Sequence, residues 1–249
     1  MHRIVAVGDV HGQWAELWQA LRAAGLAQGV GEPTSSLTGG RAQLVLVGDL
    51  VHYKDRHGYA RAVGEETFDG SCPRQLRRAA KAQIRELYRF KSYMERSGGG
   101  VDVILGNHDE VAVSRRYTLM TRGGLEHSEF DPDKGGLALP EDLCAWMTAF
   151  PRQKILGGIH FAHAGPLVGM QDYDDFFYHD PDTKNWWQNK PELAQQSGGR
   201  FGVYGHTAMP GGIYLDRDNL FAMIDALEKR EYLELAFDDD DLYAEIKTF

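Results

Sequence analysis

Cysteine and long apolar runs are both scarce in this sequence, and each absence excludes a class of protein. Only Cys72 and Cys144 occur among the 249 residues, far apart and outside any CxxC pattern. Two such cysteines argue against a disulfide framework and favour a reducing compartment. No apolar run approaches the roughly 20 residues of a membrane-spanning helix, and the run Ile4–Val7 is too short for a signal peptide. We therefore expect a cytoplasmic protein with no membrane partner.

Positive charge is scarce as well. The chain has 27 Lys and Arg residues against 36 Asp and Glu residues, which gives a formal net charge of −9. Such a surface attracts nucleic acid only through a local basic patch, so no nucleic acid partner is expected. The apolar content of 43% and the charged content of 25% are those of an ordinary globular protein. The length suffices for one well-packed domain, expected over residues 1–249, and the oligomeric state is left open.

Short apolar runs alternate with helical patterns through most of the chain. Buried strands are predicted at residues 4–7, 44–47, 101–105, 159–162 and 201–204. Apolar side chains at helical spacing predict helices after Trp14, over residues 74–96 and over residues 143–150. Strands alone end the chain, at residues 212–215, 219–224 and 231–237. This order predicts an α/β fold in which two sheets form a β-sandwich flanked by helices.

Polar side chains follow the predicted strands, each at the point where a strand ends. They are Asp9, His11, Asp49, Asn107, His108, His163 and His206. Ligands of α/β proteins collect outside the carboxyl ends of strands, so we expect these side chains to meet there. Carboxylate, imidazole and amide groups together suit manganese, iron or zinc rather than a thiolate site. Two such ions ~3.5–4 Å apart can clamp the attacking and leaving oxygens of a phosphoryl displacement.

Five short motifs stand at these strand ends in order. They are GDVHG from residue 8, GD from 48, GNHD from 106, HAG from 163 and GHT from 205. In this order the chain resembles the calcineurin-like metallophosphoesterases, above all the phosphoprotein-phosphatase branch with its bacterial protein phosphatases and symmetrical dinucleoside tetraphosphatases. The resemblance implies a metallophosphoesterase-like fold of α/β/β/α layers. It also implies two divalent metal ions, with manganese expected and iron or zinc as alternatives.

The resemblance further implies a role for each residue at the strand ends. Asp9 and His11 would bind the first metal ion, and Asp49 would bridge both ions. His108 would be the general acid that protonates the leaving oxygen, while water activated by the metal ions attacks the phosphorus. The second metal ion would be bound by Asn107, His163 and His206.

The stretch GDLVHYKDRHG, residues 48–58, departs from the family pattern soon after Asp49. The family continues with Asp-Arg-Gly, whose Asp orients the general acid and whose Arg grips the substrate phosphate. Here those positions hold His52, Tyr53 and Lys54. No implied metal ligand is lost, because Asp49 precedes the departure.

An Asp-Arg pair does occur three residues late, at Asp55 and Arg56. We expect this pair to reach the same space from a longer turn, since a few residues of loop can move a side chain by several ångströms. Asp55 would then orient His108, and Arg56 would grip the phosphate. The alternative is a grip from elsewhere in the chain, by Arg115, Arg116 or Arg200.

The expected activity is hydrolysis of phosphomonoesters, on a phosphoprotein or on a small phosphate ester. A second hypothesis is cleavage of a phosphodiester or a dinucleoside polyphosphate. For this reaction Trp186 and Trp187 could stack a base, although the same residues could equally pack within the protein. A third hypothesis is a non-catalytic phosphate-binding module. The absence of the family's Asp-Arg-Gly would permit it, but the retained set of implied metal ligands argues against it.

Residues outside the motifs have plainer interpretations. His160 is expected to be structural, because it lies three residues before His163 in a strand and points to the other face. The predicted helix at residues 74–96 carries eight Lys and Arg residues but only two Glu residues. It presents either a solvated outer face or a docking patch for an acidic partner. Four further histidines are expected at the surface, namely His2, His57, His127 and His179.

Overall fold

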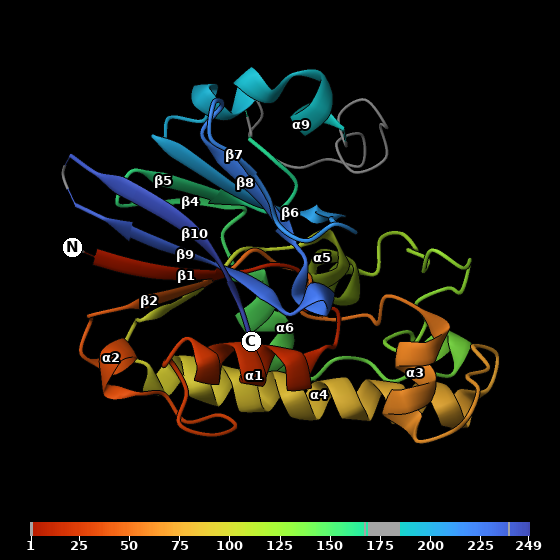
Figure 1. Ribbon diagram of the computed structural model, residues 1–249. Helices are drawn as coiled ribbons and strands as arrows, with labels where there is room; N and C mark the ends of the chain where they lie inside the picture. The colour runs from red at the N-terminus through yellow and green to blue at the C-terminus, as the bar shows by residue number, and fades with distance from the viewer. Residues whose placement is uncertain (1, 167, 169–184, 239) are drawn as a thin grey trace.

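The computed structural model describes residues 2–166, 168, 185–238 and 240–249, which form two stacked sheets between layers of helices (Figure 1). The first sheet has the order β10 (Leu242–Thr248), β9 (Glu231–Phe237), β1 (His2–Val7), β2 (Gln43–Leu46) and β3 (Val101–Val103). The second has the order β4 (Gln153–Leu156), β5 (Ile159–Ala162), β6 (Phe201–Ala208), β8 (Phe221–Asp225) and β7 (Tyr214–Asp216). The predicted α/β fold with two sheets is confirmed.

The first sheet contributes to two separate cores because its side chains alternate. On β1, Val5 and Val7 pack toward the helices, whereas Ile4 and Ala6 pack toward the second sheet. The strand β2 runs parallel to β1, with Leu44 opposite Val5, and alternates in the same way. A strand buried on both faces is apolar at successive positions, which explains the continuous apolar runs that predicted these strands.

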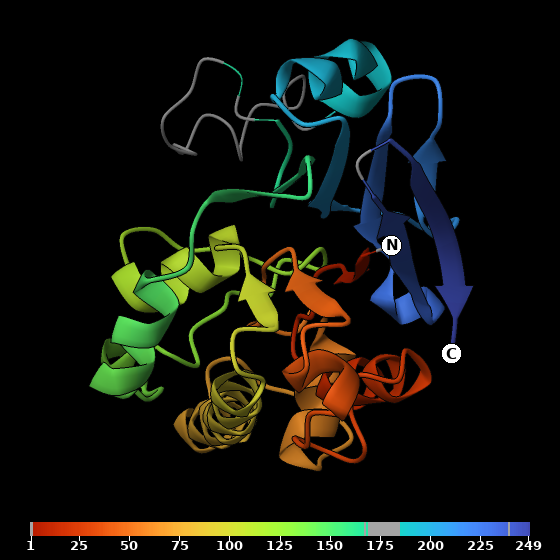
Figure 2. The same ribbon diagram turned by 90° about the vertical axis from the view of Figure 1, so that its left-hand side faces the viewer.

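Helices cover the outer faces of both sheets (Figure 2). Against the first sheet lie α1 (Trp14–Ala23), α4 (Pro73–Arg96), α5 (Asn107–Ser114) and α6 (Glu141–Thr148). Against the second lie α9 (Trp186–Asn189) and the 3-10 helix η2 (Pro191–Gln196). Shorter elements are α2 (Ser35–Thr38), α3 (Arg56–Val63), η1 (Pro132–Lys134) and η3 (Leu227–Lys229). None of the described helices combines the length and apolar character needed to cross a membrane.

Agreement with the predicted elements is close where the apolar pattern is long. The strand β9 covers residues 231–237 as predicted, and α4 begins one residue before the predicted range. Several elements were not predicted, among them β4, β10 and α3. Both strands alternate between exposed and half-buried positions and therefore contain no buried apolar run. The helix α3 is short and begins at the N-cap Asp55.

The carboxyl ends of parallel strands from both sheets meet at one side of the sandwich. β1, β2 and β3 are parallel, and so are β5, β6 and β8. Gly8, at the end of β1, lies directly against the end of β8. A Cβ atom at Gly8 would lie 1.9 Å from the Ile224 carbonyl oxygen and 2.9 Å from the Asp225 Cα. The absence of a side chain at this point therefore lets the ends of the two sheets approach each other.

Gly8→Ala should destabilise the protein by about 1–3 kcal/mol, the usual effect of overpacking a close contact. The expected observation is a lower midpoint of urea unfolding with an unchanged m-value. Gly211→Ala is a matched control, because a Cβ atom at Gly211 would have no neighbour within 4 Å. Equal midpoints for the two variants would contradict the close contact.

Candidate metal centre

Five loops or strand ends bring the predicted site residues together. The loop after β1 supplies Asp9 and His11, and the loop after β2 supplies Asp49. The start of α5, which is labelled in Figure 1, supplies Asn107 and His108. The remaining two residues come from the second sheet, where His163 follows β5 and His206 lies within β6. Residues separated by nearly 200 positions in the sequence thus share one site.

The Asp49 carboxylate lies between the two halves of this group. Its Oδ2 atom is 3.4 Å from His11 Nε2 and 3.3 Å from His163 Nε2. Its Oδ1 atom accepts a hydrogen bond of 2.8 Å from the backbone N–H of His108. Asp49 therefore occupies the central position that a bridging ligand requires.

The second half of the group gathers around the Asn107 amide. The Asn107 Oδ1 atom is 3.0 Å from His163 Nε2 and 3.1 Å from His206 Nδ1. The two imidazole nitrogens are 3.3 Å apart. One amide oxygen and two imidazole nitrogens thus converge on the same small space, next to Asp49.

Several site residues have a left-handed backbone, which non-glycine residues rarely adopt. The φ angles are 45° at His11, 51° at Asp49 and 63° at His206. Such a conformation costs roughly 1–2 kcal/mol for each residue. Local hydrogen bonds hold it: the His11 N–H donates to the Asp49 carbonyl at 2.7 Å, and the His206 N–H donates to both Asp9 carboxylate oxygens at 3.0 Å. Strain of this kind is concentrated at functional sites.

The hydrogen bonds of two histidines fix which ring nitrogen faces the site. His163 Nδ1 lies 2.7 Å from the Val47 carbonyl oxygen, and His11 Nδ1 lies 3.0 Å from the His52 carbonyl oxygen. A carbonyl only accepts, so each Nδ1 carries the hydrogen, and each ring in its neutral form turns the lone pair of Nε2 toward Asp49. Lone pairs that face a carboxylate need a cation between them, as in the carbonyl-histidine-metal arrangement of known metal sites. The donor set therefore fits divalent metal ions.

The titration of the buried site leads to the same conclusion. Burial opposes a charge on His163, but the Asp49 and Asp9 carboxylates outweigh this effect and raise the pKa of His163 to about 10. Burial likewise opposes a charge on Asp49, but His163 and His108 hold its pKa well below the usual range. Burial, Asp225 and Asp49 raise the pKa of Asp9 well above its usual range. In the absence of a metal ion, a proton on His163 supplies the positive charge that this site requires.

Asp109 connects the loops on either side of Asp49. Its carboxylate accepts hydrogen bonds from the backbone N–H groups of Leu50 at 2.8 Å and Gly106 at 3.2 Å. Burial and the nearby Asp49 raise the pKa of Asp109 to about 7. The loop after β2 and the start of α5 are thereby held in one arrangement, although the sequence analysis gave Asp109 no role.

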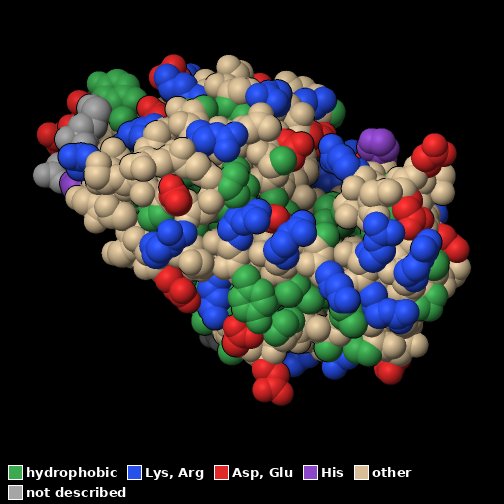
Figure 3. Space-filling view, turned by 90° about the horizontal axis from the view of Figure 1, so that it is seen from below, with side chains coloured by type: hydrophobic (Ala, Val, Ile, Leu, Met, Phe, Trp, Pro, Cys, Tyr) green, Lys and Arg blue, Asp and Glu red, His purple; other side chains and the backbone are tan. Residues whose placement is uncertain are grey.

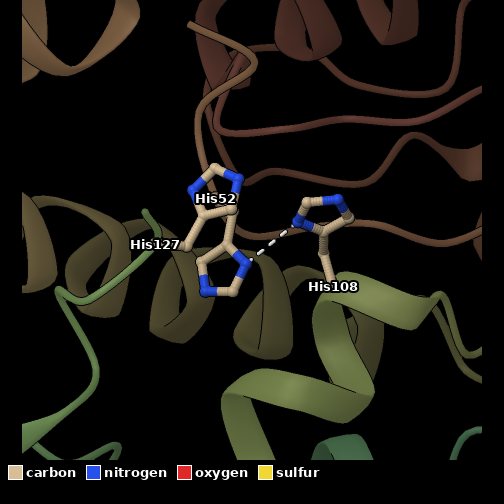
Figure 4. A group of neighbouring side chains, drawn as sticks. All are labelled: His52, His108 and His127. Atoms are coloured by element: carbon tan, nitrogen blue, oxygen red, sulfur yellow. Dashed lines mark hydrogen bonds between the residues drawn. The ribbon is translucent and has the colours of Figure 1, made fainter. Parts of the chain in front are cut away.

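The residue that contacts the expected general acid is His52. Its Nδ1 atom lies 3.0 Å from His108 Nδ1, as the dashed line in Figure 4 shows. The His52 ring stacks on His127, with centroids 4.5 Å apart and an angle of 2° between the planes. His127 was expected at the surface, and this prediction is wrong: its side chain is buried against His52 and Tyr59. His179 lies outside the described residues.

The three histidines His52, His108 and His127 are close enough to suggest a further metal site, but their rings exclude it. Their nearest nitrogen atoms lie within 4.8 Å of one another. A metal ion binds an imidazole nitrogen near the plane of the ring. Since the His52 and His127 rings are stacked in parallel planes, no single ion can lie in both planes. Their arrangement instead fits a structural support for His108.

A hydrogen-bonded network lies behind the stacked pair. His127 Nδ1 is 2.6 Å from the Tyr59 hydroxyl, which donates to Glu129 at 2.7 Å. Gln83 donates to the same carboxylate at 2.7 Å and accepts from the backbone N–H of His52 at 2.7 Å. Burial lowers the pKa of both His52 and His127 to about 3, so both rings are neutral at physiological pH.

The late Asp-Arg pair is used for local structure. Asp55 is the N-cap of α3 and accepts from the Gly58 N–H at 2.7 Å, while Arg56 donates to the Phe68 carbonyl. The structure therefore brings His52, and not Asp55, to His108. Of the alternative arginines, Arg200 donates to the Asp238 carbonyl, whereas Arg115 ends α5 and Arg116 is exposed.

Two other cations line the cavity of about 320 Å³ at the metal centre. They are Lys54, at the place of the family glycine, and Arg122, from the segment after α5. Lys54 Nζ is 2.5 Å from the Asp225 carboxylate. Burial opposes its charge, but Asp225 and Asp9 raise the pKa of Lys54, so it remains positively charged. The sequence analysis gave neither residue a role, because Lys54 stands where the family has glycine and Arg122 belongs to no motif.

The fold and the site together are those of a metallophosphoesterase. A family model described as calcineurin-like phosphoesterase matches residues 2–237, and the chain belongs to this family. The resemblance drawn from the five motifs is thereby confirmed. The family is one of metal-dependent phosphoesterases, in agreement with the donor set described above.

Individual relatives are distant. Shewanella-like protein phosphatase 2 of Arabidopsis thaliana is 27% identical over 134 residues, which cover 53% of this chain and 27% of the length of that protein. A cold-active protein-tyrosine phosphatase of a psychrophilic Shewanella species has a TM-score of 0.60 at 15% identity, covering 100% of this chain and 80% of that one. A protein serine/threonine phosphatase of Saccharomyces cerevisiae has a TM-score of 0.57 at 13% identity, with 100% and 80% covered. At these identities the solved structures show the shared fold.

Removal of the His52 imidazole should impair the donation of a proton by His108 and little else. We expect His52→Gly, which tolerates the positive φ of 64° at this position, to slow hydrolysis of alkyl phosphates by about tenfold, a part of the total effect of a general acid. Hydrolysis of p-nitrophenyl phosphate should fall much less, because its leaving group hardly needs a proton.

His52→Asp serves as the matched control, since it restores the carboxylate of the family pattern, and it should recover the rate on alkyl phosphates. Equal losses on both kinds of substrate, or a loss of bound metal in His52→Gly, would show that His52 only supports the fold.

Proposed function

We propose that this chain is a dinuclear-metal-dependent phosphatase that hydrolyses phosphomonoesters. The observation that carries the proposal is the position of Asp49, whose carboxylate faces His11 on one side and His163 on the other. Two groups of donor atoms that share one carboxylate suit a pair of ions, rather than one structural ion with a closed set of four ligands. Family membership supports the same reaction class.

Each half of the site would hold one divalent ion. Asp9 and His11 would bind the first, Asp49 would bridge, and the second would be bound by Asn107, His163 and His206. We propose manganese, with iron or zinc as alternatives, because these metals accept mixed oxygen and imidazole ligands. When bound, the two ions supply Lewis acidity that activates water and neutralises the charge of the phosphate.

His108 is the proposed general acid. Its Nδ1 atom faces His52, which leaves Nε2 to donate a proton to the leaving oxygen. His52 is neutral, so its Nδ1 can accept a hydrogen bond from the Nδ1–H of His108. This bond would fix the orientation of the His108 ring at the edge of the cavity, in place of the carboxylate that the family uses.

Arg122 and Lys54 are the proposed contacts to the substrate phosphate. Both line the cavity that contains Asp49, Asn107 and His108. Arg56, the grip expected from the sequence, is directed to the Phe68 carbonyl instead. A guanidinium can form two parallel hydrogen bonds with a phosphate, whereas Lys54 adds a point charge.

The environment of the tryptophans removes the observation that favoured a dinucleotide substrate. Trp186 is buried, donates to the Ala164 carbonyl at 3.0 Å, and packs near Tyr204 and Phe221. Trp187 packs against Tyr214, with ring centroids 5.1 Å apart. Within the described residues both rings therefore fill the second core rather than offer a face to a base.

The proposal is tested by metal analysis combined with a panel of substrates. After chelation and reconstitution, we expect two ions for each chain, with Asp49→Asn weakening both sites and His206→Ala emptying mainly the second. With manganese, zinc or magnesium, phosphomonoesters and phosphopeptides should be cleaved faster than phosphodiesters and dinucleoside polyphosphates. One ion for each chain would contradict the dinuclear site. Absence of turnover on the whole panel would favour the non-catalytic phosphate-binding module.

His108→Asn should lower the rate on alkyl phosphates by ~10²–10⁴, the usual effect of losing a general acid. The same variant should lose much less activity on p-nitrophenyl phosphate. The comparison is meaningful only at equal metal content, so bound metal is measured in each preparation. Equal losses on both substrates would assign His108 a different role.

A further inference from the structure

A basic groove lies beside the metal centre, between α1, α3 and α4. It has a volume of about 510 Å³. Its walls come from Ala15 to Arg22 on α1, Arg61 and Ala62 on α3, and Ala82 to Arg89 on α4. Figure 3 shows this side of the molecule, where Lys and Arg side chains are spread across the surface formed by the helices.

The groove is connected to the catalytic cavity. A smaller hollow shares Glu16, Tyr53 and Arg61 with the groove, and it shares His11 and Lys54 with the catalytic cavity. The catalytic cavity, the smaller hollow and the groove therefore adjoin one another in space, in that order. A substrate whose phosphate lies at the metal centre could extend along this path onto the helices.

The groove is positive although the chain as a whole has a net charge of −9. Four arginines line it against two glutamates, Glu16 and Glu86. Glu86 is already paired with Arg85 at 3.6 Å and with Arg89 at 2.8 Å. Within the part of the chain that the structure describes, the other two arginines form no ion pair; they are Arg22 and Arg61.

Basic residues of α4 outside the groove are used differently. Arg74 and Arg78 pair with Glu65, and Lys91 pairs with Asp142. These contacts connect α4 to the loop after α3 and to α6. On the groove itself, the two arginines without an ion pair among the described residues come from α1 and α3, which face α4 across it.

We propose that the groove binds an acidic segment of a phosphoprotein substrate, several residues away from the phosphorylated residue. This inference rests on the proposed phosphatase activity and narrows its substrate to a phosphoprotein. A carboxylate-rich peptide complements Arg22 and Arg61, whose charges have no internal partner. An extended peptide also fits the continuous path from the metal centre.

The geometry predicts where the acidic residues should stand. The hollow next to the metal centre has three carboxylates, Glu16, Asp55 and Glu228, against the two cations Lys54 and Arg61, so acidic residues beside the phosphorylated residue gain less there than along the groove. The wall from Ala15 to Arg22 is about 10 Å long at 1.5 Å for each helical residue. About three residues of an extended peptide span that length. A window of about three acidic residues, beginning beyond the neighbours of the phosphorylated residue, should therefore meet the arginines.

Binding of labelled peptides to the full chain tests the groove independently of catalysis. Fluorescence anisotropy measures the binding of three kinds of unphosphorylated peptide with a central serine. The distal peptides carry glutamates four to seven positions from the serine, on one side or the other. The two controls carry glutamates beside the serine, or glutamines in place of all glutamates. We expect one of the distal peptides to bind about tenfold more tightly than the glutamine peptide, the effect of two or three exposed ion pairs. The difference should disappear at high salt.

A matched pair of double variants assigns the effect to the groove. Arg22→Gln with Arg61→Gln should abolish the preference for the distal glutamates. Arg74→Gln with Arg77→Gln removes the same charge from α4 outside the groove and should leave the preference intact. If both double variants lose the preference equally, the preference depends only on the net charge of the protein, and the proposal is wrong.

Two further measurements separate this proposal from its rivals. If a short single-stranded RNA displaces the peptide as effectively as the acidic peptide itself, the assignment to an acidic peptide is wrong. The rate on each phosphopeptide is divided by the rate on p-nitrophenyl phosphate. This ratio should be about tenfold higher for a phosphopeptide with distal glutamates than for one with glutamines in their place. Peptide binding without any turnover would contradict the phosphatase, whereas turnover without a preference for acidic residues would contradict the groove.

Discussion

The arrangement of the site depends on the buried Asp49 carboxylate and on the loops that close around it. Because β2 lies between β1 and β3, the loop after β2 is in contact with the loops after both neighbours. Glycine is needed on both sides of this contact: a Cβ atom at Gly106 would lie 2.2 Å from Asp49 Oδ1, and one at Gly48 would lie 2.9 Å from His163 Nδ1. The carboxylate is therefore accessible to both halves of the site only because the backbones approach so closely. A cation at this point lowers the free energy of the whole arrangement, since it compensates the burial of Asp9 and Asp49.

The segment from His52 to Lys54 shows how a departure from the family pattern can leave such a site intact. A carboxylate behind His108 would add a further negative charge to a region that already contains Asp9, Asp49 and Asp225. His52 supplies a hydrogen bond at the same place without a charge, and the stacked His127 holds its ring. The neutral rings of His52 and His127 therefore lie beside His108, the proposed general acid. We expect a weaker stabilisation of protonated His108 than a carboxylate would provide, because a neutral acceptor interacts less strongly with a positive donor.

Sequence reasoning was most successful where the signal is local. An apolar run followed by Gly-Asp or Gly-Asn-His predicts both the strand and the residue at its end, and the topology then brings the ends together. This is why the convergence of the side chains from Asp9 to His206 could be predicted, whereas their binding of metal stays a proposal. His127 could not be found in this way, because only tertiary packing brings it to His52. The expectation for Asp55 shows the opposite error. An Asp three residues before Gly58 is also an N-cap signal, and the local hydrogen bond at the start of α3 decided its position.

The same segment also links the catalytic cavity to the basic groove. Tyr53, at the place of the family arginine, lines both the groove and the adjoining hollow, and its ring packs against Tyr59, which contacts His127. A Cβ atom at Gly12 would lie 2.4 Å from the Tyr53 ring, so the loop after β1 is also fitted to this side chain. Tyr53 is buried and uncharged, so it forms part of the wall between the two hollows without adding a cation there. Positive charge lies instead on Arg122 and Lys54, which line the cavity, and on Arg22 and Arg61, which line the groove. Contacts distributed in this way favour an extended substrate over a small ester, because only an extended chain reaches both sets of cations.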